Sequence, residues 1–259
     1  MHTLRTLVSA LALVAGGAHA VSLTGAGYTE NFDSMGTSGT TPPAGWAMLI
    51  GPSGTANSTW TSTIPAAGVT ALVPTSGPLA ASASPTTNNN NGFNAAFSTG
   101  NTSDRLLATA PTTVSGGAIE LTLSNETGAS LDQLFISYDT RRFTAVGTAN
   151  QLPGYWLFYS VNGGNWMNVS ALNPTLTEVP NTVGVTSVAN SLITLDTPVA
   201  ASQILALRWV DDNAQQTSPD QIIGLNNVSV SAVPEPAAGL LALAGLGLLL
   251  GVRARRSRG

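Results

Sequence analysis

The stretch AIELTLS, residues 118–124, alternates apolar and polar side chains and decides the fold class of the chain. Ile119, Leu121 and Leu123 occupy every second position. Successive side chains of a β-strand point to opposite faces, whereas an α-helix repeats about every 3.6 residues. The spacing therefore predicts a strand with one apolar, buried face.

Further strands are indicated on both sides of this one, at residues 133–139, 155–161, 204–210 and 226–232. The first puts Leu134, Ile136 and Tyr138 together on one face. Residues 155–161, YWLFYSV, are apolar on both faces, which indicates a central strand. Helical periodicity is nearly absent between residues 21 and 232, so we expect strands to make up this part of the chain.

The turns between these strands agree with an all-β fold. Asn162-Gly163 supplies the positive φ angles of a tight turn and predicts a hairpin after residue 161. Residues 74–85 are rich in Pro, Ser and Ala, and residues 86–92 contain four consecutive asparagines, so together they predict one exposed loop. Strands without intervening helices indicate a jelly-roll-like antiparallel β-sandwich. We expect it to be flanked by an N-terminal signal helix and a C-terminal hydrophobic helix.

The residue types that most nucleophilic and zinc chemistry requires are missing from residues 21–232. The chain has no cysteine and no lysine, and its two histidines, His2 and His19, lie in the first twenty residues. This excludes Ser-His-Asp and Cys-His nucleophile systems and zinc sites built on His or Cys. Carboxylates alone can still hydrolyse a glycosidic bond. We expect no enzyme, and a carboxylate-based glycoside hydrolase is the least favoured alternative.

Charge restricts the partners of the same segment. Residues 21–232 hold four arginines and twelve acidic residues, which gives a formal net charge of −8. An acidic body without a basic stripe argues against nucleic acid as a partner. Its length of about 210 residues is enough to bury one core without disulfides.

The first twenty residues have the order of a secretory signal peptide. Arg5 stands in a short basic start, residues 7–15 form an apolar run, and Ala18-His19-Ala20 has the small-x-small form of a cleavage site. We expect export through the Sec translocon and cleavage after Ala20. A secreted domain then begins at residue 21 and extends to residue 232.

A second signal occupies residues 233–259. Val233-Pro234-Glu235-Pro236 leads into residues 237–252, an uncharged run, and an arginine cluster closes the chain at Arg253, Arg255, Arg256 and Arg258. As a helix, residues 237–252 would span about 24 Å of a bilayer core about 30 Å thick. Terminal arginines stay on the cytoplasmic side. We expect a short transmembrane helix at 237–252.

This tail resembles the PEP-CTERM sorting signal, in which Pro-Glu-Pro, an apolar run and terminal arginines follow one another. The resemblance implies that Pro234, Glu235 and Pro236, with the arginines, are recognised by an exosortase of a Gram-negative bacterium. It also implies transient inner-membrane anchoring and delivery to the cell surface or extracellular matrix, in a biofilm or exopolysaccharide context. Within the body, Glu30-Asn31-Phe32-Asp33 and Ser103-Asp104-Arg105 resemble uncharacterised jelly-roll domains of PEP-CTERM proteins.

Oxygen-rich side chains give one candidate metal site. Asp211, Asp212 and Asp220 lie within ten residues of one another in a predicted loop, and carboxylates are ligands that Ca²⁺ prefers. These residues predict either a structural calcium site or a polar, solvated surface loop, and the loop is the favoured interpretation. Jelly-roll modules often place an aspartate where this chain has Asn226 and Asn227, which weakens any metal site taken over from them.

Aromatic and basic side chains give a candidate sugar site, at Trp156, Trp209, Arg141 and Arg142. Aromatic rings more often pack in cores than bind ligands. Three functions therefore remain open. A structural or adhesive surface protein that joins extracellular polysaccharide or other surface proteins is favoured, followed by a calcium-dependent carbohydrate-binding module and then the hydrolase.

Overall fold

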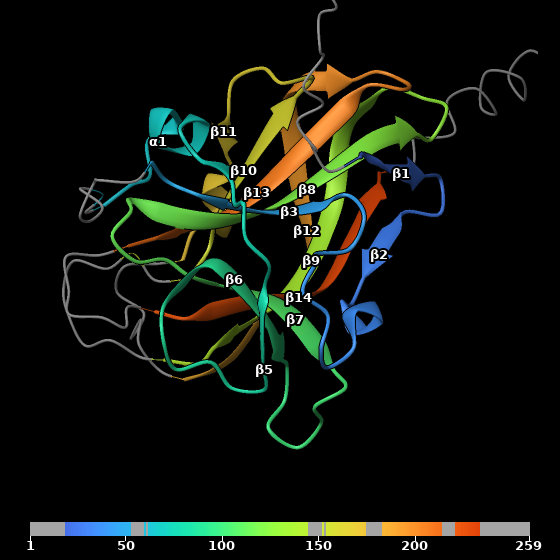
Figure 1. Ribbon diagram of the computed structural model, residues 1–259. Coiled ribbons are helices and arrows are strands. Elements are labelled where there is room, and N and C mark those ends of the chain that lie inside the picture. Colours follow the sequence, from blue (N-terminus) through green and yellow to red (C-terminus); the bar gives the residue numbers. More distant parts are fainter. Residues whose placement is uncertain are drawn as a thin grey trace, which may run out of the picture.

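The computed structural model describes residues 19–52, 60, 62–144, 152, 154–174, 183–213 and 221–233. In this part of the chain fourteen strands form two seven-stranded sheets that pack face to face (Figure 1). The first sheet has the order β11-β10-β13-β8-β3-β4, with β1 also paired to β8. The second has the order β12-β9-β14-β7-β6-β5, with β2 also paired to β14. The all-β sandwich is thus confirmed, while the two predicted flanking helices lie outside the described residues.

The bounds of the first sheet are β1 (Val21–Thr24), β3 (Trp46–Ile50), β4 (Val73–Pro74), β8 (Gly116–Glu126), β10 (Trp156–Val161), β11 (Met167–Asn168) and β13 (Ile204–Asp212). Those of the second are β2 (Tyr28–Glu30), β5 (Ala80–Ser82), β6 (Asn89–Ala96), β7 (Arg105–Ala110), β9 (Leu131–Arg142), β12 (Gly184–Val199) and β14 (Ile223–Ala232). A short helix, α1 (Ala66–Thr70), and two 3₁₀ turns, η1 (Asp33–Met35) and η2 (Ser170–Leu172), complete the described elements.

The chain changes sheet repeatedly as it proceeds. From β7 onward each connection crosses to the other sheet, except for the β10–β11 hairpin predicted from Asn162-Gly163. Both turn residues have positive φ, 49° at Asn162 and 70° at Gly163. Neighbours within a sheet are mostly antiparallel and far apart in sequence, as in the pairing of β8 with β13; β1–β8 and β5–β6 are parallel.

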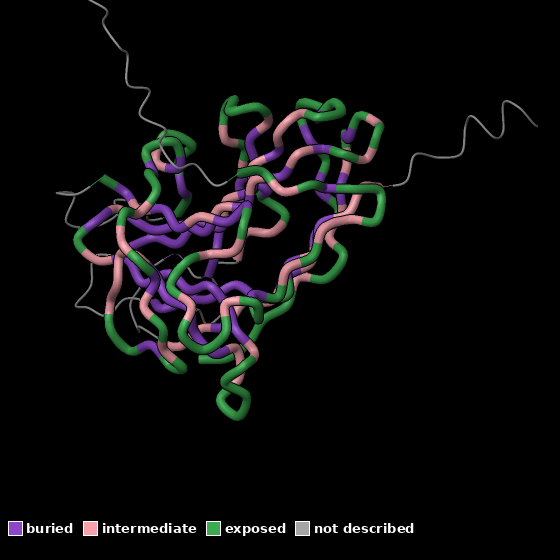
Figure 2. The backbone as a smooth tube through the Cα atoms, turned by 45° about the vertical axis from the view of Figure 1, so that its right-hand side comes forward, coloured by how far each residue is buried: buried purple, intermediate pink, exposed green. Residues whose placement is uncertain are grey.

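The main core lies between the sheets, as the alternation around AIELTLS predicts. Ile119 and Leu121 are fully buried, and Leu134 and Ile136 face them from the second sheet's β9. Trp209 lies at the centre of an aromatic cluster, stacked 5.7 Å from Trp46 and edge-on to Tyr138. Buried residues accordingly concentrate in the strands, and exposed ones at the turns (Figure 2).

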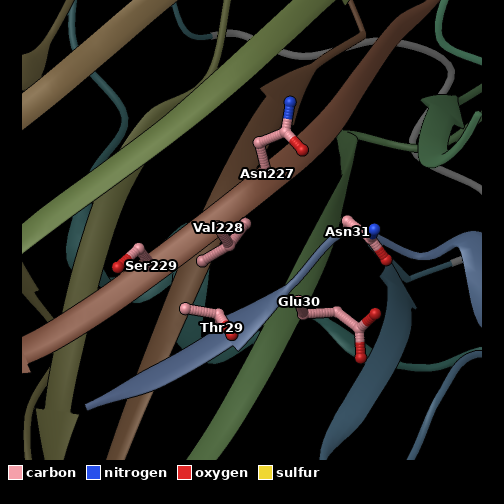
Figure 3. A pocket seen from close by; sticks show the side chains of 6 residues that line it. All are labelled: Thr29, Glu30, Asn31, Asn227, Val228 and Ser229. Carbon is pink, nitrogen blue, oxygen red and sulfur yellow. The ribbon is translucent and has the colours of Figure 1, made fainter. Parts of the chain in front are cut away.

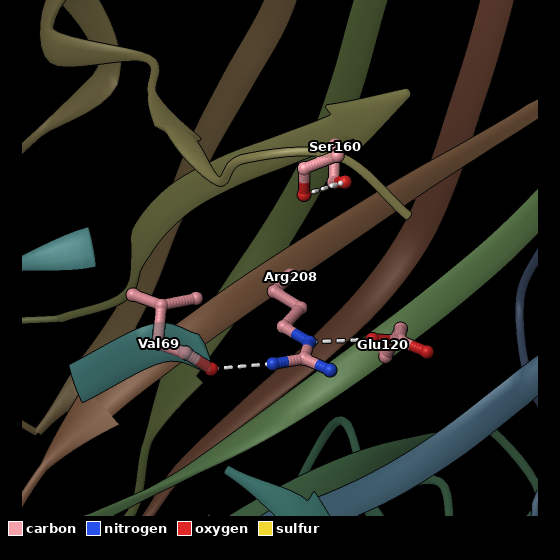
Figure 4. A network of polar contacts seen from close by, with 5 residues as sticks. Val69, Glu120, Ser160 and Arg208 are labelled. Carbon is pink, nitrogen blue, oxygen red and sulfur yellow. Dashed lines mark hydrogen bonds and ion pairs between the residues drawn. The ribbon is translucent and has the colours of Figure 1, made fainter. Parts of the chain in front are cut away.

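Two smaller cores cover parts of the outer faces. On the first sheet, Trp60 and residues 62–72, which include α1, lie over β3, β8, β10 and β13, and Trp60 and Val69 are buried there. Arg208 holds these residues on the sheet. Its guanidinium forms an ion pair with Glu120 on β8 and donates a hydrogen bond to the Val69 carbonyl (Figure 4). The same group lies 4.1 Å from the centroid of the Trp166 ring. On the second sheet, a cluster around Phe93, Leu106, Ala108 and Ile222 covers the β6–β7 side.

The prediction of one exposed loop over residues 74–92 is wrong. β5 forms at Ala80–Ser82, and the asparagine run enters β6 at Asn89. Asn90 explains how such a run can extend a sheet, because its side-chain amide pairs with both backbone groups of Thr112, at 3.1 Å and 2.8 Å. A side-chain amide here replaces a backbone partner.

All described strands and cores fall between residues 21 and 232. No helix of the described part is long and apolar enough to cross a membrane. Residues 237–252, where a transmembrane helix is predicted, lie outside that part.

Candidate functional site

The outer face of the second sheet carries a group of polar side chains beside the β6–β7 cluster, next to one apolar cross-strand pair, Phe135 and Leu192. Strand alternation turns Leu134, Ile136 and Tyr138 into the core, so the residues between them on β9 point outward. The cross-strand register then lines up polar side chains in rows. We call this surface the polar face; it consists of Thr29, Ser137, Asp139, Ser187, Asn227 and Ser229.

Hydrogen bonds hold the side chains of the polar face in place. Ser187 on β12 donates to Oδ1 of Asp139 at 2.5 Å, and Asn227 on β14 donates to Oδ2 at 2.7 Å. Ser137 accepts from the Asn190 backbone N–H at 2.8 Å. The three adjacent strands are thereby linked through their outward side chains, and both Asp139 oxygens are engaged by donors.

A bulge in β14 brings Asn227 to this surface. Asn226 pairs with Asp139 and Ser229 with Ser137, so β14 has one more residue here than β9. Asn227 takes a φ of 50°, which asparagine tolerates better than most residues. The extra residue exposes the Asn227 side chain while Val228 still enters the core.

A shallow groove of about 410 Å³ runs along the paired strands β2 and β14 and overlaps the polar face at Thr29, Asn227 and Ser229 (Figure 3). Its lining is Thr29, Glu30, Asn31, Asn227, Val228 and Ser229. Glu30 is partly fixed, because one carboxylate oxygen accepts the Phe32 backbone N–H at 2.7 Å. Hydroxyl, amide and carboxylate groups together offer both donors and acceptors, which suits a ligand rich in hydroxyl groups.

The predicted aromatic and arginine site is not assembled. Trp209 is 0% exposed between the sheets, and Trp156 is buried beneath the cover of the first sheet. Arg141 is buried on the second sheet, where it donates to the Ala96 carbonyl at 2.8 Å and lies over Phe143. The rings pack as core residues, so neither tryptophan presents a face to a ligand. Arg142 is half-buried, and burial lowers its pKa while the charge of Asp211 raises it.

Asp211 and Asp212 are not solvated loop acids, because they end β13 and are buried. Asp211 accepts hydrogen bonds from Thr109 and Gln221, both at 2.6 Å. Thr109 belongs to β7, so this contact joins the two sheets. The Tyr155 hydroxyl lies 3.0 Å from the Thr109 hydroxyl. The pKa of Tyr155 is raised well above 10, first by burial and second by the charge of Asp211.

The metal prediction finds no cluster in the described ranges: no group of three His, Cys, Asp or Glu side chains there could hold an ion. Asp220 lies outside the described residues. The same is true of Ala18 and of the predicted sorting residues Pro234, Glu235, Pro236, Arg253, Arg255 and Arg256; Ala20 immediately precedes β1.

The polar face and its groove could not be located from the sequence. Asp139 and Asn227 are separated by 88 positions and meet only through the pairing of β9 with β14. The one available signal was Asn226-Asn227, noted as a departure from jelly-roll modules.

Residues 232–258 match the family model of the PEP-CTERM protein-sorting motif. The chain carries a PEP-CTERM sorting motif. The match begins at Ala232, the last residue of β14, so the motif follows the sandwich directly. PEP-CTERM implies a secreted protein that is transiently anchored in the membrane before an exosortase processes it. The prediction made from Pro234-Glu235-Pro236 and the arginines is therefore confirmed at the level of the motif.

No curated protein matches the chain. Among solved structures, the insecticidal delta-endotoxin Cry8Ea1 of Bacillus thuringiensis has a TM-score of 0.29 and 9% identity over 51% of this chain. A family GH115 4-O-methyl-alpha-glucuronidase has a TM-score of 0.29 and 10% identity over 51%. The chain spans only 20% and 15% of these two proteins. TmCBM61, solved with beta-1,4-galactotriose, has a TM-score of 0.26 and 13% identity, over 50% of this chain and 72% of its own.

Proposed function

We propose that the PEP-CTERM chain is a non-enzymatic surface or extracellular-matrix protein of a Gram-negative bacterium, with an adhesive sandwich that holds extracellular polysaccharide. The sorting motif supports the proposed location at the cell surface or in the matrix, because it directly follows the last strand of the sandwich. The alternation of β8 to β14 between sheets supports a jelly-roll-like fold. The observation that carries the adhesive role is the groove between β2 and β14 at the margin of the polar face.

The chemistry of the groove favours a hydroxyl-rich polymer over a protein partner. Its lining residues are a threonine, a serine, two asparagines and a glutamate, together with Val228, whose side chain is buried in the core. Protein interfaces are built around aromatic and apolar anchors, and this groove has none. Polysaccharides present rows of hydroxyl groups, each of which can both donate and accept. The open shape of the groove also suits a chain that continues past it.

The same side chains do not support hydrolysis. A glycosidase needs one carboxyl group as acid and a second as nucleophile or base. Glu30 is the single carboxylate among the residues that line the groove, so the lining does not provide the pair of carboxyl groups. We therefore propose binding without turnover.

The test is a polysaccharide pull-down and glycan array with residues 21–233, in the presence of calcium and then of a chelator. Thr29 is exposed on the groove wall, so Thr29→Arg should fill the groove and weaken binding at least about tenfold, which is about 1.4 kcal/mol. Thr63→Arg is the matched control, because Thr63 is exposed in the cover of the first sheet. Equal loss in both variants, or no binding by the unmodified protein, would overturn the proposal. Loss on chelation would favour the calcium-dependent module.

A further inference from the structure

The basic side chains of residues 21–232 are withdrawn from the surface. This segment has no lysine or histidine, and its four arginines all belong to the described part of the chain. Arg105 and Arg141 are only 1% and 7% exposed, and both are hydrogen-bonded within the second sheet. Arg208 is held in an ion pair, and Arg142 is half-buried. The segment therefore presents no fully exposed basic side chain to a ligand.

Acidic side chains, in contrast, lie on the groove between β2 and β14 and directly beside it. Glu30 lines the groove and is half-exposed. Asp33 accepts a hydrogen bond from the side chain of the lining residue Asn31 at 3.0 Å. Asp139 accepts one from the side chain of the lining residue Asn227 at 2.7 Å. These three carboxylates make the potential of the groove negative, because no exposed basic side chain balances them.

The hydrogen-bond donors of the groove are directed mainly to acceptors of the protein itself. One side-chain N–H of Asn31 and one of Asn227 are taken up by the neighbouring carboxylates. The backbone N–H of Phe32 binds the Glu30 carboxylate at 2.7 Å. The backbone N–H of Asn227 binds the side-chain oxygen of Asn226 at 2.8 Å. The groove consequently offers more acceptors than donors to a ligand, since a carboxylate oxygen can accept more than one hydrogen bond.

We propose that the groove takes an amino polysaccharide, a polymer whose sugar units carry free, protonatable amines besides their hydroxyl groups. This inference rests on the proposed function and names the class of its ligand. An ammonium group donates three hydrogen bonds and accepts none, so it complements a site rich in carboxylate acceptors. Its positive charge is also attracted by residues 21–232, whose formal net charge is −8.

Acidic polysaccharides suit the groove least. Carboxylate and sulfate groups only accept hydrogen bonds, and basic side chains are their strongest partners in proteins. Arg105 approaches the groove region, because its backbone N–H binds Asp33 at 2.8 Å. Its guanidinium is nevertheless buried and donates to Asn94 and Thr102. Neutral polysaccharides can use their hydroxyl groups but gain nothing from the charge, so the expected order of affinity is amino, neutral and then acidic polymers.

The first test is calorimetric titration of residues 21–233, which contain every described strand and core and lack the arginines of the tail. The ligands are a glucosamine oligomer, its fully N-acetylated counterpart and a galacturonic acid oligomer of equal length, at a mildly acidic pH that protonates the amines. We expect the glucosamine oligomer to bind at least about tenfold more tightly than the N-acetylated one, and less tightly as salt rises.

The outcomes separate this inference from the adhesive function on which it rests. Equal affinity for the amine and its N-acetylated counterpart would overturn the amino-polysaccharide assignment and leave the adhesive function in place. The same holds if the galacturonic acid oligomer binds most tightly. Absence of binding to any polysaccharide would overturn both proposals.

The second test places the charge in the groove. Glu30→Gln removes one negative charge from the lining and keeps an oxygen that can accept the Phe32 N–H. Glu126→Gln is the matched control, because Glu126 is exposed at the end of β8 in the first sheet and accepts from Ser124. Glu30→Gln should weaken binding of the glucosamine oligomer about threefold to fivefold and leave the N-acetylated oligomer unaffected. Equal loss in the two variants would contradict a ligand in the groove, and thermal melting of both checks that they fold.

Discussion

At the scale of single residues, Arg105 links the groove region to the sheet. Its side chain is 1% exposed, and it donates from Nε to Asn94 Oδ1 at 2.7 Å and from Nη1 to the Thr102 carbonyl at 2.9 Å. Its backbone N–H binds Asp33 Oδ1 at 2.8 Å, in the turn that follows β2. Arg105→Met keeps the length but leaves buried acceptors without donors, so it should lower the free energy of unfolding by about 3 kcal/mol. Urea unfolding of residues 21–233 measures this loss.

Arg105→Lys is the control for charge alone, because lysine keeps the cation without the planar fork of donors. We expect an intermediate loss; stability of both variants equal to that of the unmodified protein would show that the network contributes nothing. In the sequence, Ser103-Asp104-Arg105 could be recognised only by its resemblance to jelly-roll domains of PEP-CTERM proteins, and no role of Arg105 in the fold was predicted. Its burial could not be predicted, because Asp33 lies 72 positions away from Arg105 and meets it only in the folded sandwich.

At the scale of elements, α1 is held on the sheet beneath it by the burial of Val69 and by one hydrogen bond from Arg208. This helix has five residues, too few to be stable alone, and Arg208 of β13 donates to the Val69 carbonyl near its end. Arg208→Met should therefore release the cover. We expect backbone amide exchange of residues 66–72 to rise at least about tenfold, while β8 and β13 keep their protection.

Glu120→Gln should give a weaker effect, because it removes the charge of the ion pair and leaves the Arg208 donor to Val69 in place. Uniform loss of protection over both sheets would contradict a local role.

Alternation was sufficient to predict β8 and β9, but not their partners, because the pairing of β8 with β13 spans the intervening strands. The sequence did not predict β12, because its bulges break the alternation with a period of two. Asp211 and Asp212 were predicted to lie in a solvated loop, because acidic side chains are common in loops, but they end β13.

At the scale of the whole molecule, the tyrosines set the alkaline limit of stability. The chain has four, and burial is the first cause of a raised pKa in each: to about 12 for Tyr28, and above its ordinary value for Tyr138, Tyr155 and Tyr159. Because the pKa of these tyrosines is higher in the folded state than in the unfolded state, the folded protein keeps the hydroxyl protons up to a higher pH. The resulting stabilisation is complete below pH about 10 and is lost as the pH rises through the folded values.

This loss of stability at alkaline pH should be attributable mainly to the tyrosines, because the chain has no lysine or cysteine side chains that titrate in the same pH range. We expect urea midpoints of residues 21–233 to fall steadily above pH about 10, in step with phenolate absorbance in the unfolded fraction. Tyr28→Phe removes one of the four groups, along with the hydrogen bond that the Tyr28 hydroxyl accepts from Trp46 at 2.7 Å. It should lower stability at neutral pH and make the alkaline slope shallower. A slope that is unchanged in this variant would contradict a contribution of Tyr28 to this loss. The buried arginines cannot cause the loss, because burial lowers their pKa and a folded pKa below the unfolded one makes stability rise with pH.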